Sequence, residues 1–286
     1  TLAAGLLASL IGLVAPGISQ AEVNICTSDA DFDAGNLDGV DQVSPGELEL
    51  AAIGSTFPVM WIANAGEDTV SRIDTDANCE VARYRTWFAG SHLNNAFVGP
   101  APSRTAVDGD ANVYVANRWF SPARPATLLK ILSDGGIDRN GNGVIDTSFD
   151  ANGDCSIQPG EIIPLVDLNS NGLLEDNELA DERVVWARNV GPQPLGHNNG
   201  LGRSVCIDPE EDIWVGLFNR QEYWEFDSDG NLKSGPHSVS PITPYGCLVD
   251  RNGVLWSADR GGGDFGRKIG KFDTVSKTLQ GVFNHG

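Results

Sequence analysis

The sequence is poor in positive charge. Its 286 residues include 19 Lys and Arg against 39 Asp and Glu, and the formal net charge is −20. Because DNA, RNA and anionic lipid surfaces repel so acidic a protein, the composition argues against nucleic acid as a partner. Long apolar runs are also missing. The run at residues 2–14 is shorter than the roughly 20 residues of a membrane span, so we expect no span in the mature chain.

Common catalytic and metal-binding patterns are absent as well. The sequence has no C-x-x-C, H-x-x-H, H-E-x-x-H or G-x-S-x-G pattern, which argues against zinc, redox and serine-hydrolase sites. The cysteines are Cys26, Cys79, Cys155, Cys206 and Cys247. Their number is odd and their spacing irregular, so they form no disulfide framework, and we expect one or two structural bridges.

The N-terminal apolar run has the features of a secretory signal peptide. Ser19 and Ala21 place small residues at the −3 and −1 positions of a cleavage site. We expect the mature chain to begin near Glu22 and to be secreted, either extracellular or periplasmic. The chain starts with Thr1 and lacks a Lys/Arg-bearing region before the run, so we expect the reading frame to be incomplete.

A repeated pattern of short strands runs through the chain. Its four copies are centred on Trp61, Tyr114, Trp214 and Trp256, each inside an apolar, strand-like segment. In the last three copies an earlier strand ends in Asp and a polar turn joins the two strands. An alternating third strand follows in every copy, and a fourth is visible at residues 81–87.

Four short strands per unit are typical of a β-propeller blade. The four aromatic residues are spaced by 53, 100 and 42 residues, and the last spacing fits one blade. The middle spacing fits one blade with an insert of about 50 residues. A β-sandwich is the alternative all-β fold, but the fixed order of Asp, hairpin and aromatic residue favours the propeller.

This pattern divides the chain into segments. They are a signal peptide at 1–21, an N-terminal strand segment at 22–58, blades at 59–133, an acidic insert at 134–182 and further blades at 183–286.

Two cysteines lie near the ends of successive first strands. Cys206 and Cys247 precede the terminal Asp of their strands by two and three residues, so alternation points them to opposite faces of their blades. Because neighbouring blades present opposite faces to each other, we expect a disulfide to be possible across that junction.

The segment from Pro244 to Trp256 resembles the blade signature of the streptogramin (virginiamycin B) lyase-like propellers. It is more loosely similar to NHL-repeat and gluconolactonase-like propellers, and the resemblance covers about residues 59–133 and 197–283. Such propellers have six or seven blades. The resemblance therefore implies an all-β propeller of which four blades are legible, with further blades missing at the C-terminus.

The acidic insert carries calcium-loop patterns. It holds 12 acidic side chains and one basic residue, Arg139, so counter-ions are expected. The loop from Asp167 to Glu178 has oxygen ligands at positions 1, 3, 5, 9 and 12 and Gly172 at position 6, which is the full EF-hand pattern. The loop from Asp150 to Glu161 repeats it, with Cys155 where Gly normally permits the sharp turn.

A third loop begins at Asp138 but has Phe149 at position 12, so its bidentate carboxylate must come from elsewhere, and the neighbouring Asp150 is the expected donor. Ordinary Asp/Asn/Gly turns are the alternative for any one loop. The close spacing resembles the calcium repeats of dockerins and thrombospondin-type segments, and the small apolar content suggests that calcium orders the insert. The candidate ligands are Asp138, Asn140, Asn142, Asp146, Asp150, Asn152, Asp154, Ser156, Glu161, Asp167, Asn169, Asn171, Leu173 and Glu178.

Candidate ligand-binding residues lie at the ends of the repeat strands. Propellers bind ligands where strand ends and loops of all blades converge. Residues just after the aromatic strands and at the start of the first strands should meet there. They are Asn64, Asn117, Arg118, Asp259, Arg260, Arg104, Arg203 and Tyr245.

Two functional hypotheses follow. The first is a secreted, calcium-stabilised propeller that binds a glycan or a surface protein on this face. The second, implied by the resemblance, is a divalent-metal-dependent lyase or lactonase. The lyases are understood to use a histidine base and a magnesium-binding glutamate, but those positions are not recognisable here. His197 is the best single candidate for a base.

Overall fold

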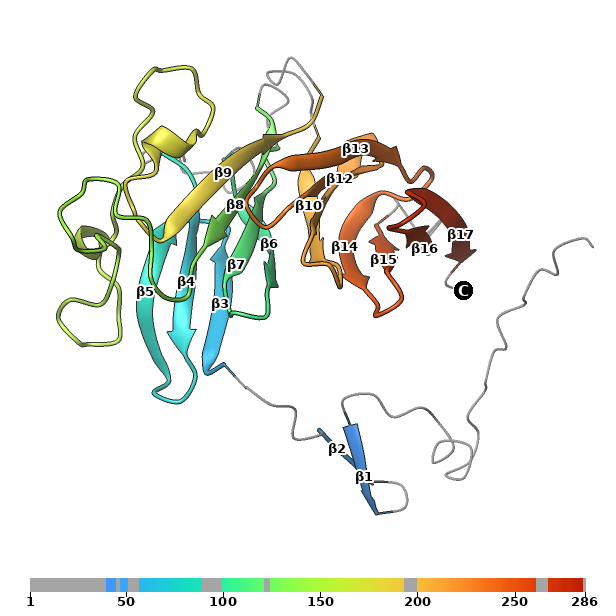
Figure 1. Cartoon of the computed structure of the whole chain (residues 1–286), viewed down its shortest axis with the longest axis horizontal. Helices are drawn as coiled ribbons and strands as arrows, with labels where there is room; N and C mark the ends of the chain where they lie inside the picture. The colour runs from blue at the N-terminus through green and yellow to red at the C-terminus, as the bar shows by residue number, and fades with distance from the viewer. Residues whose placement is uncertain are drawn as a thin grey trace, which may run out of the picture. The chain divides into compact units, whose positions relative to one another are not determined.

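The computed structural model describes residues 40–44, 47–50, 57–88, 99–120, 124–192, 200–260 and 267–284 (Figure 1). The chain forms two units, Thr1–Thr56 and Phe57–Gly286. In the first unit β1 (Val40–Ser44) pairs antiparallel with β2 (Glu47–Leu50). The proposed signal peptide, Cys26 and His197 all lie outside the described residues.

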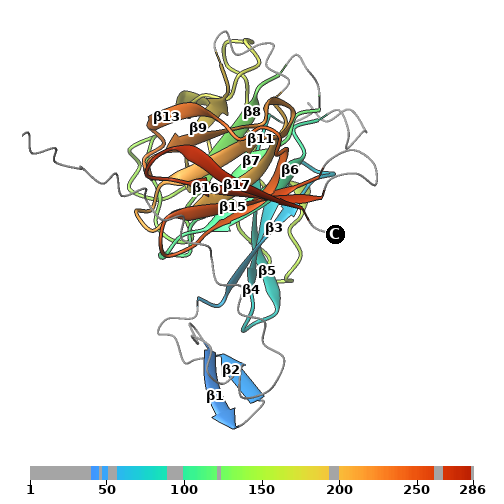
Figure 2. The same cartoon turned by 90° about the vertical axis from the view of Figure 1, so that its right-hand side faces the viewer.

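The second unit consists of four consecutive antiparallel sheets, seen from two sides in Figures 1 and 2. The first sheet has β3 (Val59–Asn64), β4 (Thr69–Asp74) and β5 (Cys79–Arg85), and the second has β6 (Pro102–Val107), β7 (Val113–Asn117), β8 (Ala126–Ile131) and β9 (Val184–Val190). The third has β10 (Gly202–Ile207), β11 (Ile213–Leu217), β12 (Glu222–Phe226) and β13 (Leu232–Ser238). The fourth has β14 (Pro244–Val249), β15 (Val254–Asp259), β16 (Lys268–Asp273) and β17 (Thr278–Asn284). Within each sheet, strands that are neighbours in sequence are neighbours in space.

The sheets pack face to face as propeller blades do. The first strand β10 lies against the first strands β6 and β14 of the sheets on either side, and the outer strands β13 and β17 also meet. Side-chain alternation explains how one sheet serves two interfaces: Val113 and Val115 pack toward the first sheet, whereas Tyr114 and Ala116 pack toward the third. The prediction of an all-β propeller with four legible blades is confirmed.

The repeat aromatics occupy equivalent places, three residues before the end of β3, β7, β11 and β15. Trp61, Tyr114 and Trp214 are buried because the following sheet covers them, and the Nε1 of Trp61 donates to the carbonyl of Ala111 in the second sheet at 3.0 Å. Trp256 in the last sheet is 36% exposed, since no described sheet follows it.

The Asp of the repeat ties its own hairpin to the aromatic residue. Asp208 accepts backbone N–H groups of Glu210 and Asp212 with one carboxylate oxygen, and with the other it accepts the Nε1–H of Trp214 at 2.8 Å. The other two hairpins use Asp108 with Tyr114 and Asp250 with Trp256 in the same way. The recurrence of Asp and aromatic in the sequence therefore has a direct physical cause.

The acidic insert leaves the second sheet after β8 and returns at β9 (Figure 1), and it contains two short 3₁₀ helices, η1 (Pro159–Glu161) and η2 (Asp176–Glu178). Leu165, Leu174 and Leu179 of the insert are each 1% exposed and join the core between the first and second sheets. Part of the insert is therefore core in spite of its small apolar content. That calcium orders the insert stays a prediction.

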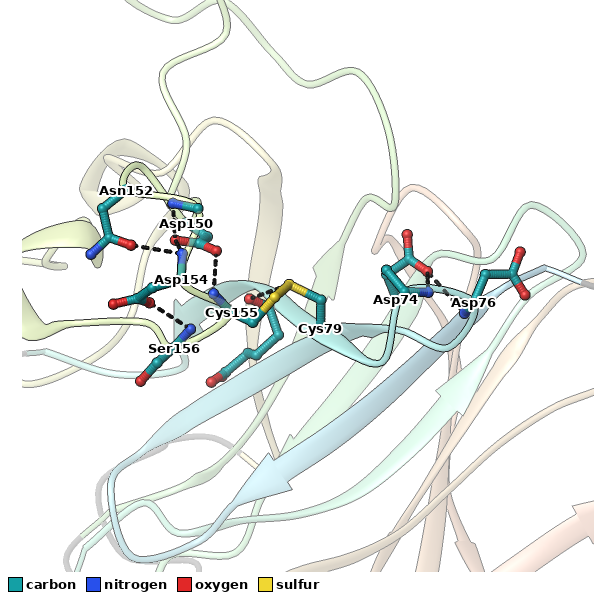
Figure 3. Close-up of a disulfide and its surroundings, with 11 residues drawn as sticks. Asp74, Asp76, Cys79, Asp150, Asn152, Asp154, Cys155 and Ser156 are labelled. Atoms are coloured by element: carbon teal, nitrogen blue, oxygen red, sulfur yellow. Dashed lines mark hydrogen bonds between the residues drawn. A yellow bond between two sulfur atoms is a disulfide. The ribbon is translucent and has the colours of Figure 1, made fainter.

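The described residues form two disulfides. Cys206 and Cys247 join β10 to β14 with a Cα–Cα distance of 5.7 Å, which confirms the expected bridge between successive blades. Cys79 at the start of β5 bonds to Cys155 in the insert, with a Cα–Cα distance of 4.7 Å (Figure 3). Within the described residues, no helix has the length and apolarity that crossing a bilayer would require.

Removing either bridge should destabilise the blades. The bridges span sequence separations of 41 and 76 residues. Closing loops of that length in the unfolded chain is worth about 4 kcal/mol in the chain-entropy model. We expect Cys206→Ala/Cys247→Ala and Cys79→Ala/Cys155→Ala each to lower the free energy of unfolding, measured by urea denaturation. If both double variants unfold at the same urea concentration as the unaltered protein, the two disulfides do not stabilise the blades.

Candidate functional site

The candidate site lies at the edge where the first strands begin and the second strands end, which we call the upper rim. It is defined by the strand pairs Pro102 with Asn117, Gly202 with Leu217, and Pro244 with Asp259. Three consecutive blades therefore bring equivalent residues to one edge. The first sheet contributes no first strand within the described residues.

A register irregularity recurs at the upper rim. In β6, β10 and β14 the pairing skips the second residue, so Ser103, Arg203 and Tyr245 each stand outside the ladder. Bulges of this kind bend a strand and re-aim the side chain of the extra residue. The side chains of Arg203 in β10 and Tyr245 in β14 therefore do not follow the inward–outward alternation of their strands.

Arginine and aromatic side chains meet there, forming what we call the arginine–aromatic cluster. Its members are Arg104, Arg118, Phe120, Arg203, Phe218, Tyr245 and Arg260. The guanidinium carbons of Arg203, Arg104 and Arg260 lie 4.3, 4.7 and 5.4 Å from the centre of the Tyr245 ring. Cation–π attraction acts over such distances.

Phe120 and Phe218 complete the cluster. Arg118 lies 4.9 Å from the ring of Phe120, and Arg203 lies 5.9 Å from the rings of both phenylalanines. Phe218 opens the short 3₁₀ helix η4 (Phe218–Arg220) directly after β11, the place that Arg118 and Arg260 hold after β7 and β15. That equivalence is the sequence signal for Phe218, whereas Phe120 has none in the repeat.

The cluster is rich in positive charge. Burial, and then the neighbouring Arg203 and Arg104, lower the pKa of Arg118. Burial also lowers the pKa of Arg203, which is 6% exposed and whose Nε has no hydrogen-bond partner. Among the described residues, no carboxylate lies within ion-pair distance of the four guanidinium groups.

Tyr245 responds to these charges. Burial raises the pKa of its hydroxyl, but the opposing effects of Arg203, Arg104 and Arg260 prevail, and the pKa lies below its usual value. Arginine charges favour the phenolate because they attract the negative oxygen.

Three other predicted ligand-binding residues are engaged elsewhere. Asn117 is fully buried and donates to the carbonyl of Thr86 and the hydroxyl of Thr127, so it joins the first two sheets and is closed to a ligand. Asn64 donates to Thr69 and Ser71 within its own sheet, and Asp259 accepts from the backbone and hydroxyl of Thr243.

The three loops of the insert share one hydrogen-bonding scheme. The Asp at position 1 accepts the backbone N–H of position 6: Asp138 from Gly143 at 2.8 Å, Asp150 from Cys155 at 2.8 Å and Asp167 from Gly172 at 2.9 Å. Asn or Asp at positions 3 and 5 accept the N–H two residues further on, as Figure 3 shows for the second loop. Cys155 takes the left-handed conformation of the glycines, with φ of 63°.

A carboxylate closes each loop. Glu161 accepts the N–H groups of Ala151 and Gln158, which are positions 2 and 9, and Glu178 accepts the equivalent pair in its loop. In the first loop Glu182 takes this role, accepting from Arg139 at 2.6 Å and Asp146 at 2.8 Å. The expected donor Asp150 belongs to the second loop instead, so that expectation is corrected.

Other carboxylate groups gather outside the predicted loops. Asp208, Asp212 and Glu225 are buried at the opposite edge of the third sheet, with their oxygens within 4.8 Å of one another. Lys277 pairs with Glu225 at 2.6 Å, and Lys233 pairs with Asp212. Asp150 also lies near Cys79 and Cys155, but these sulfurs are bonded to each other and hold no metal.

The fold and the rim together define a β-propeller protein with a cationic face. No family model and no curated protein matches the sequence. Among solved structures, the chain is similar to a streptogramin B lyase (11% identity, TM-score 0.45, covering 79% of this chain and 51% of that one) and to virginiamycin B lyase from Staphylococcus aureus (12%, 0.45, 84% and 60%). It is also similar to a gluconolactonase from Xanthomonas campestris (17%, 0.42, 79% and 58%). The chain thus spans between half and three fifths of the length of these proteins.

The environment of Tyr245 gives a spectroscopic prediction. Of the four tyrosines, Tyr84, Tyr114 and Tyr223 have their pKa raised by burial, that of Tyr223 to about 12. Ultraviolet titration should therefore show a single tyrosine ionising below the ordinary pKa of about 10. This step should vanish in Tyr245→Phe and move to higher pH in Arg203→Gln. A low-pH step that persists in Tyr245→Phe would contradict the assignment.

Proposed function

We propose that the protein is a secreted, calcium-stabilised β-propeller that binds a ligand, a glycan or a surface protein, at its upper rim. One observation carries the binding function: five of the eight residues expected there, Arg104, Arg118, Arg203, Tyr245 and Arg260, converge in one cluster. They come from three successive blades. Rims where loops and strand ends of several blades meet are the usual ligand sites of such folds.

The charge state of the cluster supports binding over a purely structural role. A structural arginine in a protein with twice as many acidic as basic residues is expected to find a carboxylate partner. Arg203 is buried against aromatic rings, its side-chain hydrogen bond goes to Tyr245 rather than to a carboxylate of the described residues, and its Nε is unsatisfied. Leaving such a donor unpaired costs free energy that a bound ligand would recover.

A glycan array tests this function. We expect the calcium-loaded protein to bind a subset of glycans, and Tyr245→Ala and Arg260→Gln to lose that binding. Arg251→Gln is the matched control, because Arg251 is exposed in the β14–β15 turn at the opposite edge of the same sheet. Equal binding by all four proteins would contradict a site at the rim. Binding to no glycan, together with capture of a cell-surface protein that depends on Arg260, would support the surface-protein ligand.

Calcium is the ion that fits the three loops. Their donors are carboxylate, amide and carbonyl oxygens, the ligands that calcium prefers. The Oδ1 atom of Asp167 is buried without a hydrogen-bond partner, as expected for an atom that faces a cation. The residues that would hold the ions are those at positions 1, 3 and 5 of each loop, with Glu161, Glu178 and Glu182 closing the second, third and first loops. Bound calcium would offset repulsion among the 12 acidic side chains of the insert.

Calcium should stabilise the blades as well as the insert, because three insert leucines lie in the shared core. At a free concentration of a hundred times Kd, each site adds about 2.7 kcal/mol to the free energy of unfolding. We expect calorimetric titration of the calcium-stripped protein to show two or three sites. Glu178→Gln and Glu182→Gln should each remove one site while keeping a similar shape.

Glu210→Gln serves as the control, since Glu210 is exposed in the β10–β11 turn outside the insert. It should bind calcium like the unaltered protein. No heat at millimolar calcium, or an unchanged melting temperature with and without the ion, would remove calcium from the proposal.

A lyase or lactonase is the second candidate, and the lowered pKa of Tyr245 favours it. A tyrosine hydroxyl beside three arginines suits proton abstraction, because the arginines favour its phenolate form and would stabilise a developing oxyanion. The groups of three metal-ligating side chains found in the described residues lie away from this rim, which does not support a metal there. Hydrolysis of glucono-1,5-lactone that is lost in Tyr245→Phe would support this candidate. Equal rates in both proteins would exclude Tyr245 as its base.

A further inference from the structure

We propose that the arginine–aromatic cluster recognises a single anionic group, a carboxylate or a sulfate, carried by a sugar. This inference rests on the proposed ligand-binding function and specifies its chemistry. It follows from the charges around the four arginines, from their hydrogen-bond donors and from the burial of Arg203.

The first argument is the local charge. The chain has a net charge of −20, yet four of its 19 basic side chains gather in one place without a carboxylate in ion-pair distance among the described residues. Arg104 and Arg203 lower the pKa of Arg118, after burial itself. Neighbouring arginines therefore make the charges of Arg118 and Arg203 less stable, and an anion bound among them would relieve this repulsion.

The second argument is the supply of hydrogen-bond donors. A guanidinium carries five N–H donors and accepts nothing. Arg104 donates through Nε to the carbonyl of Tyr245 and through Nη1 to that of Ser103, and Arg118 donates through Nε to the carbonyl of Ala101. These backbone bonds fix the two side chains and leave further N–H groups of each. Such pre-oriented forks match the two or three oxygens of a carboxylate or sulfate.

The third argument is the burial of Arg203. This side chain is only 6% exposed, so a broad protein surface would not reach it, and a single group projecting from a small ring suits it better. A standard protein interface buries about 800 Å² on each partner and draws on 20 to 30 residues. The cluster has seven side chains. The rings of Phe120, Phe218 and Tyr245 supply the apolar walls that small-molecule sites combine with a few charged groups.

The test uses calorimetric titration of the full chain with D-glucuronate, D-glucose 6-sulfate and D-glucose at fixed ionic strength. We expect one or both anionic sugars to bind and glucose to bind at least tenfold more weakly. Arg260→Gln should weaken the anionic sugar roughly tenfold or more, because a hydrogen bond to a charged group is worth about 1.5–3 kcal/mol. Arg251→Gln should bind like the unaltered protein.

Arg260 is exposed, so its substitution does not threaten the fold, and Arg203→Gln provides a second variant at the buried position. When the anion binds, the ionisation step of Tyr245 should also move to higher pH, because the anion's negative charge disfavours the phenolate. Binding of glucuronate but not of glucose 6-sulfate would identify the anionic group as a carboxylate, and the reverse result would identify it as a sulfate.

Failures of the two proposals are distinguishable. If the array finds Arg260-dependent binding to neutral glycans only, ligand binding stands and the anionic specificity is overturned. If the protein binds a poly-glutamate peptide but neither of the two anionic sugars, the inference that a sugar carries the anionic group is overturned. Equal affinity for glucose and glucuronate, or equal anion binding by Arg260→Gln and Arg251→Gln, also overturns the inference.

Discussion

The hydrogen bonds of one Asp in each of the last three repeats underlie the architecture. Asp108, Asp208 and Asp250 each close a hairpin with one oxygen and hold the following aromatic residue with the other. Because the aromatic side chain is fixed from its own sheet, it presents a defined surface to the next. Trp214 meets Phe272 of the last sheet in this way, with ring centres 5.5 Å apart. Local order in a hairpin thus sets the packing between blades.

The same hairpins place chemistry at the other end of the sheets. With the turn fixed at one edge, the start of the first strand and the end of the second must meet at the upper rim. A bulge at that point frees Arg203 and Tyr245 from the ladder. The cost of gathering four arginines there is met by stacking on aromatic rings and by bonds to backbone carbonyls, because the described residues offer them no carboxylate.

Features with a local or periodic cause could be predicted from the sequence. The blade repeat, the equivalence of the four aromatics and the Cys206–Cys247 bridge all follow from strand alternation and fixed spacing. The convergence of Arg203 and Tyr245 follows from the same register. Asn117 stays outside the cluster: strand-end position says nothing of burial, and this side chain is fully buried, with its amide nitrogen donating to Thr86 and Thr127.

Features that depend on distant segments could not be predicted. Nothing near Asp138 indicates that Glu182 closes its loop, because the two meet only when the insert folds back to β9. The Cys79–Cys155 pairing needs the insert to lie against β5 (Figure 3). The leucines of the insert look like spacers between acidic loops, and only the first sheet, packed against them, reveals them as core.

The place of these leucines has a consequence for the modularity of the protein. An inserted segment is usually tolerated because it projects from a surface loop and leaves the host unchanged. Here Leu165, Leu174 and Leu179 fill space between two blades, and a covalent bond fastens the segment to β5. Excision would leave a hole in the host, and the isolated segment would lose the wall against which its own apolar side chains rest. The insert and its two blades are therefore expected to fold as one unit.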